Sequence, residues 1–540
     1  MLRVHQIPLS LDAAAEADEE ALRSLAAKTL HLPAALIQNV LLKQRGIDAR
    51  HKENIRFTLT LELELTGGPN KERALAARFK PNQVLFFPNR TKPSDQGLYH
   101  LPLTPWPSGQ PQPLVAGAGP AGLFCALALA LRGAKPILLE RGSNVEKRVK
   151  DVKAFETLGR LDPESNVLFG EGGAGAFSDG KLTCGLNHPH IDTILETLHA
   201  CGAPHDILTD SRPHIGTDKL YPVLQGLRAQ LLAHGARVLF HHKVTGIKLR
   251  NGSVYAARVA HGGTEFDIGT TRIYLAIGHS ARDTYEWLYA MGLPMEAKPF
   301  AVGARIEHRQ EAIQRAQYGG AWNHPALPPA DYKLSVPTPD GRGVYTFCMC
   351  PGGRVIGAVQ EEGAVNVNGM SLHARNGMNA NAALLTGVKP ADYGSNHPLA
   401  GVEFQRRMER AAFRASGSYA ALCQRSGDLV AGKASKGFHG VRPSYLPVVC
   451  PGEIMSCLPT FVVENLRHAL PKLAQRLSGF NDPDALLTAP ETRSSSPVRL
   501  LRNDRRESAI GGLYPLGEGA GYAGGIISAA VDGLCAGMET

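Results

Sequence analysis

The chain has 540 residues, enough for two to four domains at roughly 150 residues each. Hydrophobic residues make up 43% and charged residues 20% of it, which excludes collagen-like, disordered and disulfide-scaffold proteins. A net charge of +9 is a mild excess for this length and does not by itself indicate nucleic-acid binding. Nine cysteines without zinc-like spacing, an acidic start unlike a signal peptide and the short apolar run Leu123–Leu131 predict a cytoplasmic protein without a membrane span.

The first 105 residues predict a small α/β domain of the ferredoxin-like type. An acidic helix start near residues 15–30 precedes the alternating, β-branched segment Ile55–Leu65, and Val84–Phe87 is a further candidate strand. The next segment, Leu101–Pro113, has five prolines among thirteen residues. Because prolines at this density forbid regular structure, we expect a domain boundary there.

A complete dinucleotide-binding pattern follows the boundary. The apolar strand Leu114–Ala116 runs into a G-x-G-x-x-G motif and a helical stretch, and a second strand ends at Glu140, 23 residues after the first glycine. The three glycines permit a tight turn, close approach of a pyrophosphate and helix packing, while the acidic residue accepts a ribose hydroxyl. They are Gly117, Gly119 and Gly122. The motif does not distinguish NAD from FAD.

Three further segments suggest a ligand cradle. The loop Phe169–Lys181 is rich in glycine and brings backbone N–H groups against a ligand. The apolar strand Arg272–Gly278 ends in glycine, where the chain must pass a bound cofactor. Near the end of the chain, Gly512–Gly525 repeats a strand, an acidic turn and a glycine-rich helix start, followed by a helix over Ile526–Cys535.

Together these segments resemble the glutathione-reductase-like class of flavoproteins, in which a G-x-G-x-x-G motif and a distant glycine-acid motif enclose one FAD. More specifically, the chain resembles the bacterial family of FAD-dependent, or NAD(FAD)-utilising, dehydrogenases. The segments that carry this second resemblance are Phe169–Thr183, Ala304–His308, Phe347–Gly353, Glu491–Arg499 and Gly517–Gly533, with Arg45–Arg50 in the small N-terminal domain.

The resemblance implies FAD as the cofactor. It assigns the adenosine ribose to Glu140, the adenine to the backbone of Val244, and the phosphates or ribityl chain to Arg148. Glu518 stands where the class usually has an aspartate for the ribityl hydroxyls, and the helix after Gly525 directs its positive end at the flavin ring. The expected cofactor-binding residues are Gly117, Gly119, Pro120, Ala121, Gly122, Glu140, Arg141, Arg148, Gly172, Gly173, Gly175, Lys181, Val244, Gly278, Gly517, Glu518, Gly524, Gly525 and Ile526.

Disulfide reductases of this class also carry a second dinucleotide-binding domain for NAD(P)H and a C-x-x-x-x-C pair, and we identify neither in this sequence. The expected fold is therefore α/β, or α+β overall. Residues 106–285 and 501–540 form a Rossmann-like FAD-binding domain from discontinuous segments. Residues 286–500 form a β-rich substrate domain inserted within it, and residues 1–105 form the small N-terminal domain.

No catalytic residue is assigned from the sequence, but four groups are candidates. Cys348–Cys350 suggests a redox thiol, although its strand-like pattern before a Pro-Gly turn favours packing. His279 lies at the expected cofactor rim, as an acid or base or as a surface residue. Arg305 and Glu307 share one face of a strand, where pairing is the simpler expectation than substrate binding. The polar segment Arg493–Arg499 could bind an anionic group.

We expect an FAD-dependent oxidoreductase that exchanges hydride between flavin and an organic substrate, most simply across a C–C or C–N bond. A flavin monooxygenase, which would need a route for NAD(P)H reduction, is one alternative. An RNA-associated flavoprotein or binding module is another, suggested by a pI near 9.0 and the N-terminal domain but disfavoured because basic motifs interleaved with aromatic residues are missing. The expected partner is a small-molecule substrate, with NAD(P)H or another electron carrier left open; no metal is expected.

Overall fold

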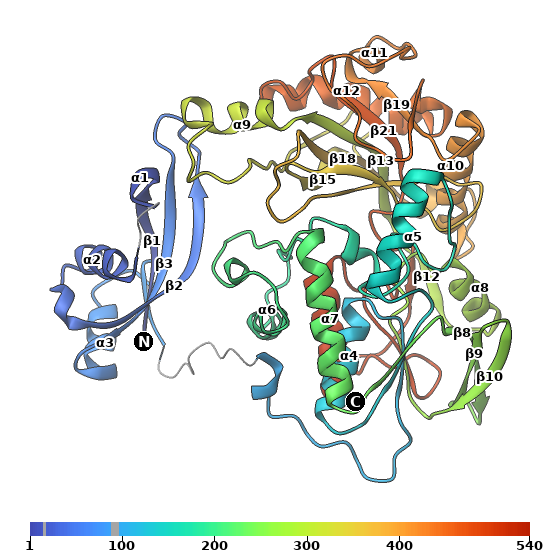
Figure 1. Cartoon of the computed structure of the whole chain (residues 1–540), viewed down its shortest axis with the longest axis horizontal. Helices are drawn as coiled ribbons and strands as arrows, with labels where there is room; N and C mark the ends of the chain where they lie inside the picture. The colour runs from blue at the N-terminus through green and yellow to red at the C-terminus, as the bar shows by residue number, and fades with distance from the viewer. Residues whose placement is uncertain (15–17, 88–96, 540) are drawn as a thin grey trace.

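The computed structural model describes residues 1–14, 18–87 and 97–539 and contains three structural units. Their central sheets have four, five and seven strands. Figure 1 shows the N-terminal unit on one side of the molecule and the seven-stranded sheet above the domain that contains α4 and α7. The mixed α/β fold, with a Rossmann-type domain, confirms the predicted fold class.

The N-terminal unit has the ferredoxin-like topology. Its sheet has the order β2-β3-β1-β4, and each neighbouring pair is antiparallel. Its elements are β1 (Leu2–Ser10), α1 (Leu11–Ala14), α2 (Glu19–Leu30), β2 (Ile37–Asp48), β3 (Arg56–Leu65), α3 (Gly68–Ala76) and β4 (Val84–Phe86). Residues 15–17, where the sequence suggested the helix start, lie outside the described residues; α2 begins after Asp18, which accepts a hydrogen bond from the Ala21 N–H. Strands β1 and β2 were not predicted from the sequence. A bulge interrupts the alternating pattern of β1, and β2 is largely polar.

The second unit is built on a parallel sheet of order β23-β11-β5-β6-β7. Its strands are β5 (Leu114–Ala116), β6 (Ile137–Glu140), β7 (Arg237–Phe240), β11 (Ile273–Leu275) and β23 (Leu513–Pro515). Its helices include α4 (Pro120–Leu131), α5 (Val145–Leu158), α6 (His190–Ala200), α7 (Thr217–Ala233), α8 (Arg282–Ala290) and α13 (Ile526–Glu539). A small antiparallel sheet, β8 (Lys243–Arg250), β9 (Ser253–His261) and β10 (Thr264–Gly269), lies beside it. Strands β7 and β8 are separated at His241, which adopts a left-handed φ of 58°.

The C-terminal segment completes this domain by close helix packing. Strand β23 pairs in parallel with β11, and α13 packs along α4, which is buried on nearly its whole surface. A Cβ at Gly533 would collide with the carbonyl of Ala121, and one at Gly537 would approach the carbonyl of Cys125 to 2.6 Å. The two glycines therefore allow the last helix to dock against the first helix of the domain.

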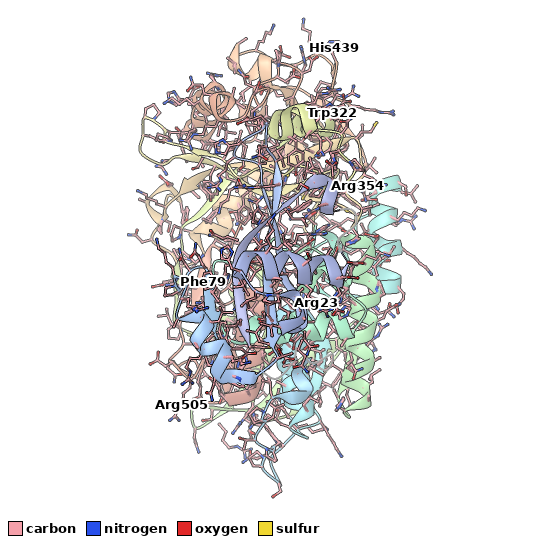
Figure 2. The ribbon with its side chains drawn as sticks, turned by 90° about the vertical axis from the view of Figure 1, so that its left-hand side faces the viewer. Arg23, Phe79, Trp322, Arg354, His439 and Arg505 are labelled. Atoms are coloured by element: carbon pink, nitrogen blue, oxygen red, sulfur yellow. The ribbon has the colours of Figure 1, made fainter. Side chains whose placement is uncertain are left out.

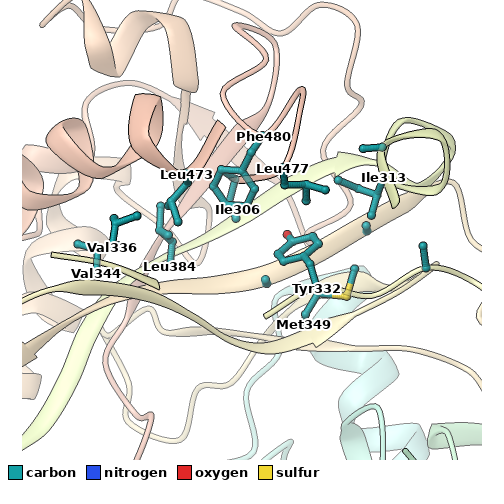
Figure 3. Packing of buried hydrophobic residues seen from close by; sticks show 14 of the residues in the cluster. Ile306, Ile313, Tyr332, Val336, Val344, Met349, Leu384, Leu473, Leu477 and Phe480 are labelled. Atoms are coloured by element: carbon teal, nitrogen blue, oxygen red, sulfur yellow. The ribbon is translucent and has the colours of Figure 1, made fainter. Parts of the chain in front are cut away.

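The third unit is a mostly antiparallel sheet of order β14-β15-β18-β13-β21-β19-β20. Its strands are β13 (Phe300–Arg309), β14 (Ser335–Val336), β15 (Val344–Cys350), β18 (Asn379–Val388), β19 (Ala421–Arg425), β20 (Val449–Pro451) and β21 (Leu486–Glu491). Helices α9 (Gln310–Tyr318), α10 (Ala400–Ser416), α11 (Ser426–Val430) and α12 (Thr460–Arg476) pack with it, as does the hairpin β16 (Arg354–Gly357) and β17 (Val367–Met370). Figure 3 shows its core, where the rings of Tyr332 and Phe480 lie 5.6 Å apart beside Ile306. The pair β12 (Met295–Ala297) and β22 (Val498–Leu500) flanks this unit in sequence on both sides.

The N-terminal unit is attached to the dinucleotide-binding domain through the backbone of β2. The Arg45 N–H donates to the carbonyl of Thr209, and the Ser211 N–H donates to the carbonyl of Arg45. Lys43 forms an ion pair with Asp192 on α6 at 3.1 Å. Figure 2 looks onto this unit, with Arg23 of α2 toward the viewer. Among the described residues, no helix combines the length and apolarity needed to cross a membrane.

Candidate functional site

The loops predicted to bind a cofactor meet at the carboxyl edge of the parallel sheet. They follow β5, β6, β11 and β23, and this edge is the usual ligand position in open α/β sheets. Gly117 has a φ of +104°, and a Cβ there would collide with the carbonyl of Ala276. A Cβ at Gly122 would collide with the carbonyl of Gly117. These two glycines therefore have the turn and helix-packing roles that the motif predicts.

Four other glycines face open space. The nearest atom to a Cβ built at Gly119 is the Cα of Gly173, at 3.8 Å, and nothing lies within 4 Å of one built at Gly278, Gly524 or Gly525. Helix α4 begins immediately after Gly119 and has no side-chain cap, so its first N–H groups are available to a phosphate. The arrangement forms a cradle, lined by backbone, that added side chains would fill. It fits an extended dinucleotide.

Glu140 ties three of the loops together. Its carboxylate is 4% exposed and accepts hydrogen bonds from the N–H groups of Ala118 (2.8 Å), Gly142 (2.9 Å) and Gly170 (3.0 Å). A carboxylate has about four acceptor sites, so one remains for a ribose hydroxyl. The predicted ribose contact stays a prediction, and the structure adds a bracing role. The Glu140 carbonyl also accepts from the His242 N–H, which brings β8 and Val244 to the same edge.

Arg148 braces the glycine-rich loop from behind. Its side chain is fully buried, and its guanidinium donates to the carbonyls of Asn166, Val167 and Glu171 at 2.6 to 2.9 Å. All three nitrogens are occupied by backbone, so the predicted contact with phosphates or the ribityl chain does not fit this geometry. The role of Arg148 is to shape the loop.

The braced loop reaches both ends of the cradle. The Gly172 N–H donates to the carbonyl of Ala118 at 2.8 Å, which sets Gly173 against Gly119. A Cβ at Gly175 would lie 3.2 Å from the side chain of Ile526, the first residue of α13. The predicted residues of the first, second and last motifs are therefore adjacent in space.

Two predicted basic residues are engaged by carboxylates. Arg141 pairs with Glu164 and Asp283, and its guanidinium lies 4.1 Å from the centre of the Phe169 ring. Lys181 pairs with Asp179 at 2.7 Å and also donates to the carbonyl of Met349. Both therefore fasten the loop to its neighbours, and their contact with a cofactor stays a prediction.

His279 and Glu518 are the titratable groups at the meeting point of the last two loops. The His279 Nε2 lies 3.9 Å from the Glu518 Oε1, and the His279 Nδ1 is buried without a hydrogen-bond partner. Burial, reinforced by the positive charges of Arg493 and Arg282, lowers the pKa of His279 to about 3. Burial raises the pKa of Glu518 to about 7, against the opposing effect of Lys298. Gly517, before Glu518, donates its N–H to Asp532 of α13 at 2.7 Å.

A buried polar layer, which was not predicted from the sequence, joins the parallel-sheet domain to the seven-stranded unit. Glu409 of α10 is fully buried and accepts hydrogen bonds from Arg282 of α8 and from Arg493, at 2.8 to 3.0 Å. Thr492 also donates to this carboxylate at 2.6 Å. The available signal was periodicity: Gln405, Met408, Glu409 and Ala412 share the buried face of α10, so a charge there needed partners.

The remaining candidates resolve into structural roles. Arg305 and Glu307 do not pair with each other as expected, because Arg305 pairs with Glu491 at 2.7 Å while Glu307 accepts from Asn379 at 3.0 Å. Cys348 and Cys350 are both free thiols. Burial raises the pKa of Cys350 to about 12, and this buried thiol fits the packing interpretation. Desolvation also raises the pKa of Cys348, which argues against a reactive thiolate, but Cys348 is exposed and does not pack in the core.

Comparison with known proteins assigns the family. Residues 299–494 match the family described as "FAD-dependent protein, C-terminal domain-like", and residues 1–64 match a domain of unknown function (DUF8436). An uncharacterized protein of Clostridium beijerinckii is 43% identical over 537 residues, covering 99% of this chain and 97% of its own length.

Similar solved structures are distant. A variant of the E. coli quinol fumarate reductase FrdA is 13% identical over 79% of this chain and 69% of that chain, with a TM-score of 0.35. A geranylgeranyl bacteriochlorophyll reductase-like protein of Thermoplasma acidophilum is 14% identical over 78% and 75%, with a TM-score of 0.33. They do not bear on the reaction. The full-length relationship shows that the chain belongs to the family of the Clostridium beijerinckii protein, and the matched C-terminal domain family supports FAD as the cofactor.

Proposed function

We propose that the protein is an FAD-dependent dehydrogenase or reductase that exchanges hydride with an organic substrate at the carboxyl edge of its parallel sheet. The observation that carries the proposal is the cradle of open glycines, which runs from Gly119 past Gly278 to Gly524 and Gly525. This cradle crosses adjacent parallel strands, as an extended dinucleotide requires.

In this proposal, Gly119 and the uncapped start of α4 hold the pyrophosphate, and the ring end lies near Gly278 and the start of α13. When bound, FAD supplies the capacity to accept or donate hydride. The positive end of α13 favours negative charge next to it. The domain contact made by Glu409, Arg282 and Arg493 holds the seven-stranded unit next to His279, whose pKa is lowered in part by the charges of both arginines.

The absorption spectrum of the purified protein tests the proposal. We expect flavin bands and release of FAD on heating, followed by anaerobic bleaching with one of NADH, NADPH or a panel of organic acids and amines. A colourless protein that takes up no added FAD would refute the proposal. Bleaching by NAD(P)H together with substrate-stimulated oxygen consumption would instead favour the monooxygenase.

A further inference from the structure

We propose that His279 and Glu518 form a proton-transfer pair of the flavin site, which takes up the substrate proton that accompanies hydride transfer. This inference rests on the proposed function, because it places the reaction at the cradle. Both residues follow a glycine at the end of a strand, and the two strands, β11 and β23, are parallel neighbours. The loops touch: a Cβ at Gly519 would lie 2.6 Å from the carbonyl of Gly278.

His279 has the geometry of a relay. Its side chain is 10% exposed, its Nδ1 is buried without a partner, and its Nε2 is directed at Glu518 across 3.9 Å. An unpaired buried nitrogen is costly, so the Nδ1 is available to a partner that a bound ligand supplies. Burial lowers the pKa of the ring most, and the positive groups Arg493, Arg282 and Lys298 lower it further, so the imidazole stays neutral at pH 7. A neutral imidazole accepts a proton at one nitrogen while it releases one from the other.

Glu518 is the acceptor at the other end of the relay. Its carboxyl is 27% exposed and has no ion pair with Lys or Arg among the described residues. The groups that face it are His279, Lys298 and the hydroxyl of Tyr285, which is itself engaged with the carbonyl of Gly519 at 2.6 Å. A carboxyl that exchanges its proton near neutral pH can take up and release a proton in every turnover.

The step balances without a further reactant. A substrate H–C–X–H, with X as oxygen or nitrogen, loses hydride from carbon to the cofactor and the proton of X to the Nδ1 of His279. The Nε2 proton passes to the Glu518 carboxylate once the 3.9 Å gap closes to about 2.8 Å. The C–H and X–H bonds break, a C=X bond forms, and Glu518 becomes the neutral acid. Glu518 later releases its proton to solvent, and loss of the Nδ1 proton with uptake of one at Nε2 restores the starting tautomer of His279.

The first test measures the reduction potential of the bound FAD between pH 6 and 9 by equilibration with redox dyes. Reduction adds negative charge near Glu518 and raises its pKa further, so above pH 7 the wild type takes up one additional proton. One additional proton per two electrons steepens the potential by 29.6 mV per pH unit. Glu518→Gln loses this additional slope and Glu518→Asp keeps it; Glu265→Gln, an exposed control on β10, matches the wild type.

The second test follows the absorption spectrum of the oxidised protein through a pH titration. We expect a one-proton change near pH 7 that Glu518→Gln abolishes. Lys298→Met raises the midpoint, because Lys298 lowers the pKa of Glu518. After a pH jump, His279→Asn slows this change at least tenfold. Three results would each overturn the inference: an unaltered pH slope of the reduction potential in FAD-bound Glu518→Gln, an unmoved midpoint in Lys298→Met, or an undiminished rate in His279→Asn. Failure of the wild-type protein to bind FAD would instead refute the proposed function.

Discussion

The substitution Glu409→Gln isolates the contact between the two large domains. The wild-type carboxylate is fully buried between the guanidinium groups of Arg282 and Arg493. The amide leaves two buried cations with one acceptor oxygen between them and places an NH2 group against one of them. Removing one partner of a buried ion pair typically costs about 3–5 kcal/mol. For a domain of the size of the seven-stranded unit, that loss lowers Tm by roughly 6–20 °C, at about 2–4 °C per kcal/mol.

Glu403→Gln is the matched control on the same helix. Glu403 is 56% exposed and pairs with Arg406, so its substitution costs less than about 1 kcal/mol. Thermal unfolding followed by circular dichroism, with bound flavin fluorescence as a second probe, compares the two variants. Equal Tm values for Glu409→Gln and Glu403→Gln would refute the interpretation that the buried layer stabilises the domain contact.

The pH dependence of the stability difference between the wild type and Glu409→Gln gives an independent check. Burial alone would raise the pKa of Glu409, but Arg282 and Arg493 outweigh burial and hold it well below its usual value. The stabilisation is therefore present above the pKa of the unfolded carboxyl and is lost as the pH falls toward the folded pKa. The difference in unfolding free energy between wild type and Glu409→Gln should shrink below about pH 4.5 by about 1.4 kcal/mol per pH unit. A constant difference from pH 7 to pH 3.5 would contradict this assignment.

Three further substitutions test the cradle and its supports. Gly119→Val should fold normally but lose FAD during desalting, because the added side chain enters the open cradle. The control Gly269→Val, on the exposed strand β10, should retain FAD, and full FAD occupancy in Gly119→Val would contradict the proposed site. Glu140→Ala should weaken FAD binding and also lower the unfolding free energy by about 1–3 kcal/mol for each buried N–H left unpaired, measured by urea titration; unchanged stability would argue against the bracing role. Gly533→Leu should separate α13 from α4 and raise sensitivity to proteolysis near the C-terminus, whereas Gly524→Leu, with no atom within 4 Å, should affect FAD binding and not proteolysis.

Features whose residues lie close together in the sequence were predicted best. The motif at Gly117 and the strand ending at Glu140 are coded within 30 residues, and their turn and packing geometry could be read directly. The late motif at Gly517 was placed next to the first through the family resemblance. The structure explains that placement physically, since Gly533 and Gly537 let α13 approach the backbone of α4.

The errors share a physical cause, which is partner choice over long sequence separations. Arg148 was expected at the cofactor because it is basic and follows the motif, yet its donors are occupied by the carbonyls of residues 166, 167 and 171. Arg305 was matched with Glu307, two positions away on the same strand face, but its partner is Glu491 on the neighbouring strand. Residue spacing shows that a buried charge needs a partner. It does not identify which of the many carboxylates or carbonyls the fold brings near.

Contacts between segments that are distant in sequence also couple the cofactor site to the stability of the fold. The cradle combines loops at residues 117–119, 170–175, 278–279 and 517–525, which lie on segments separated by up to about 400 positions. Three of these loops are held by hydrogen bonds to distant segments: Gly170 donates to Glu140, Gly172 donates to the carbonyl of Ala118, and Gly517 donates to Asp532 of α13. A ligand that contacts all four loops binds only when the distant segments are assembled, so its binding energy adds to the folding free energy as RT ln(1 + [L]/Kd). Saturation at 100 times Kd therefore contributes about 2.7 kcal/mol, comparable to most of the loss expected for Glu409→Gln, and added FAD should offset much of that loss.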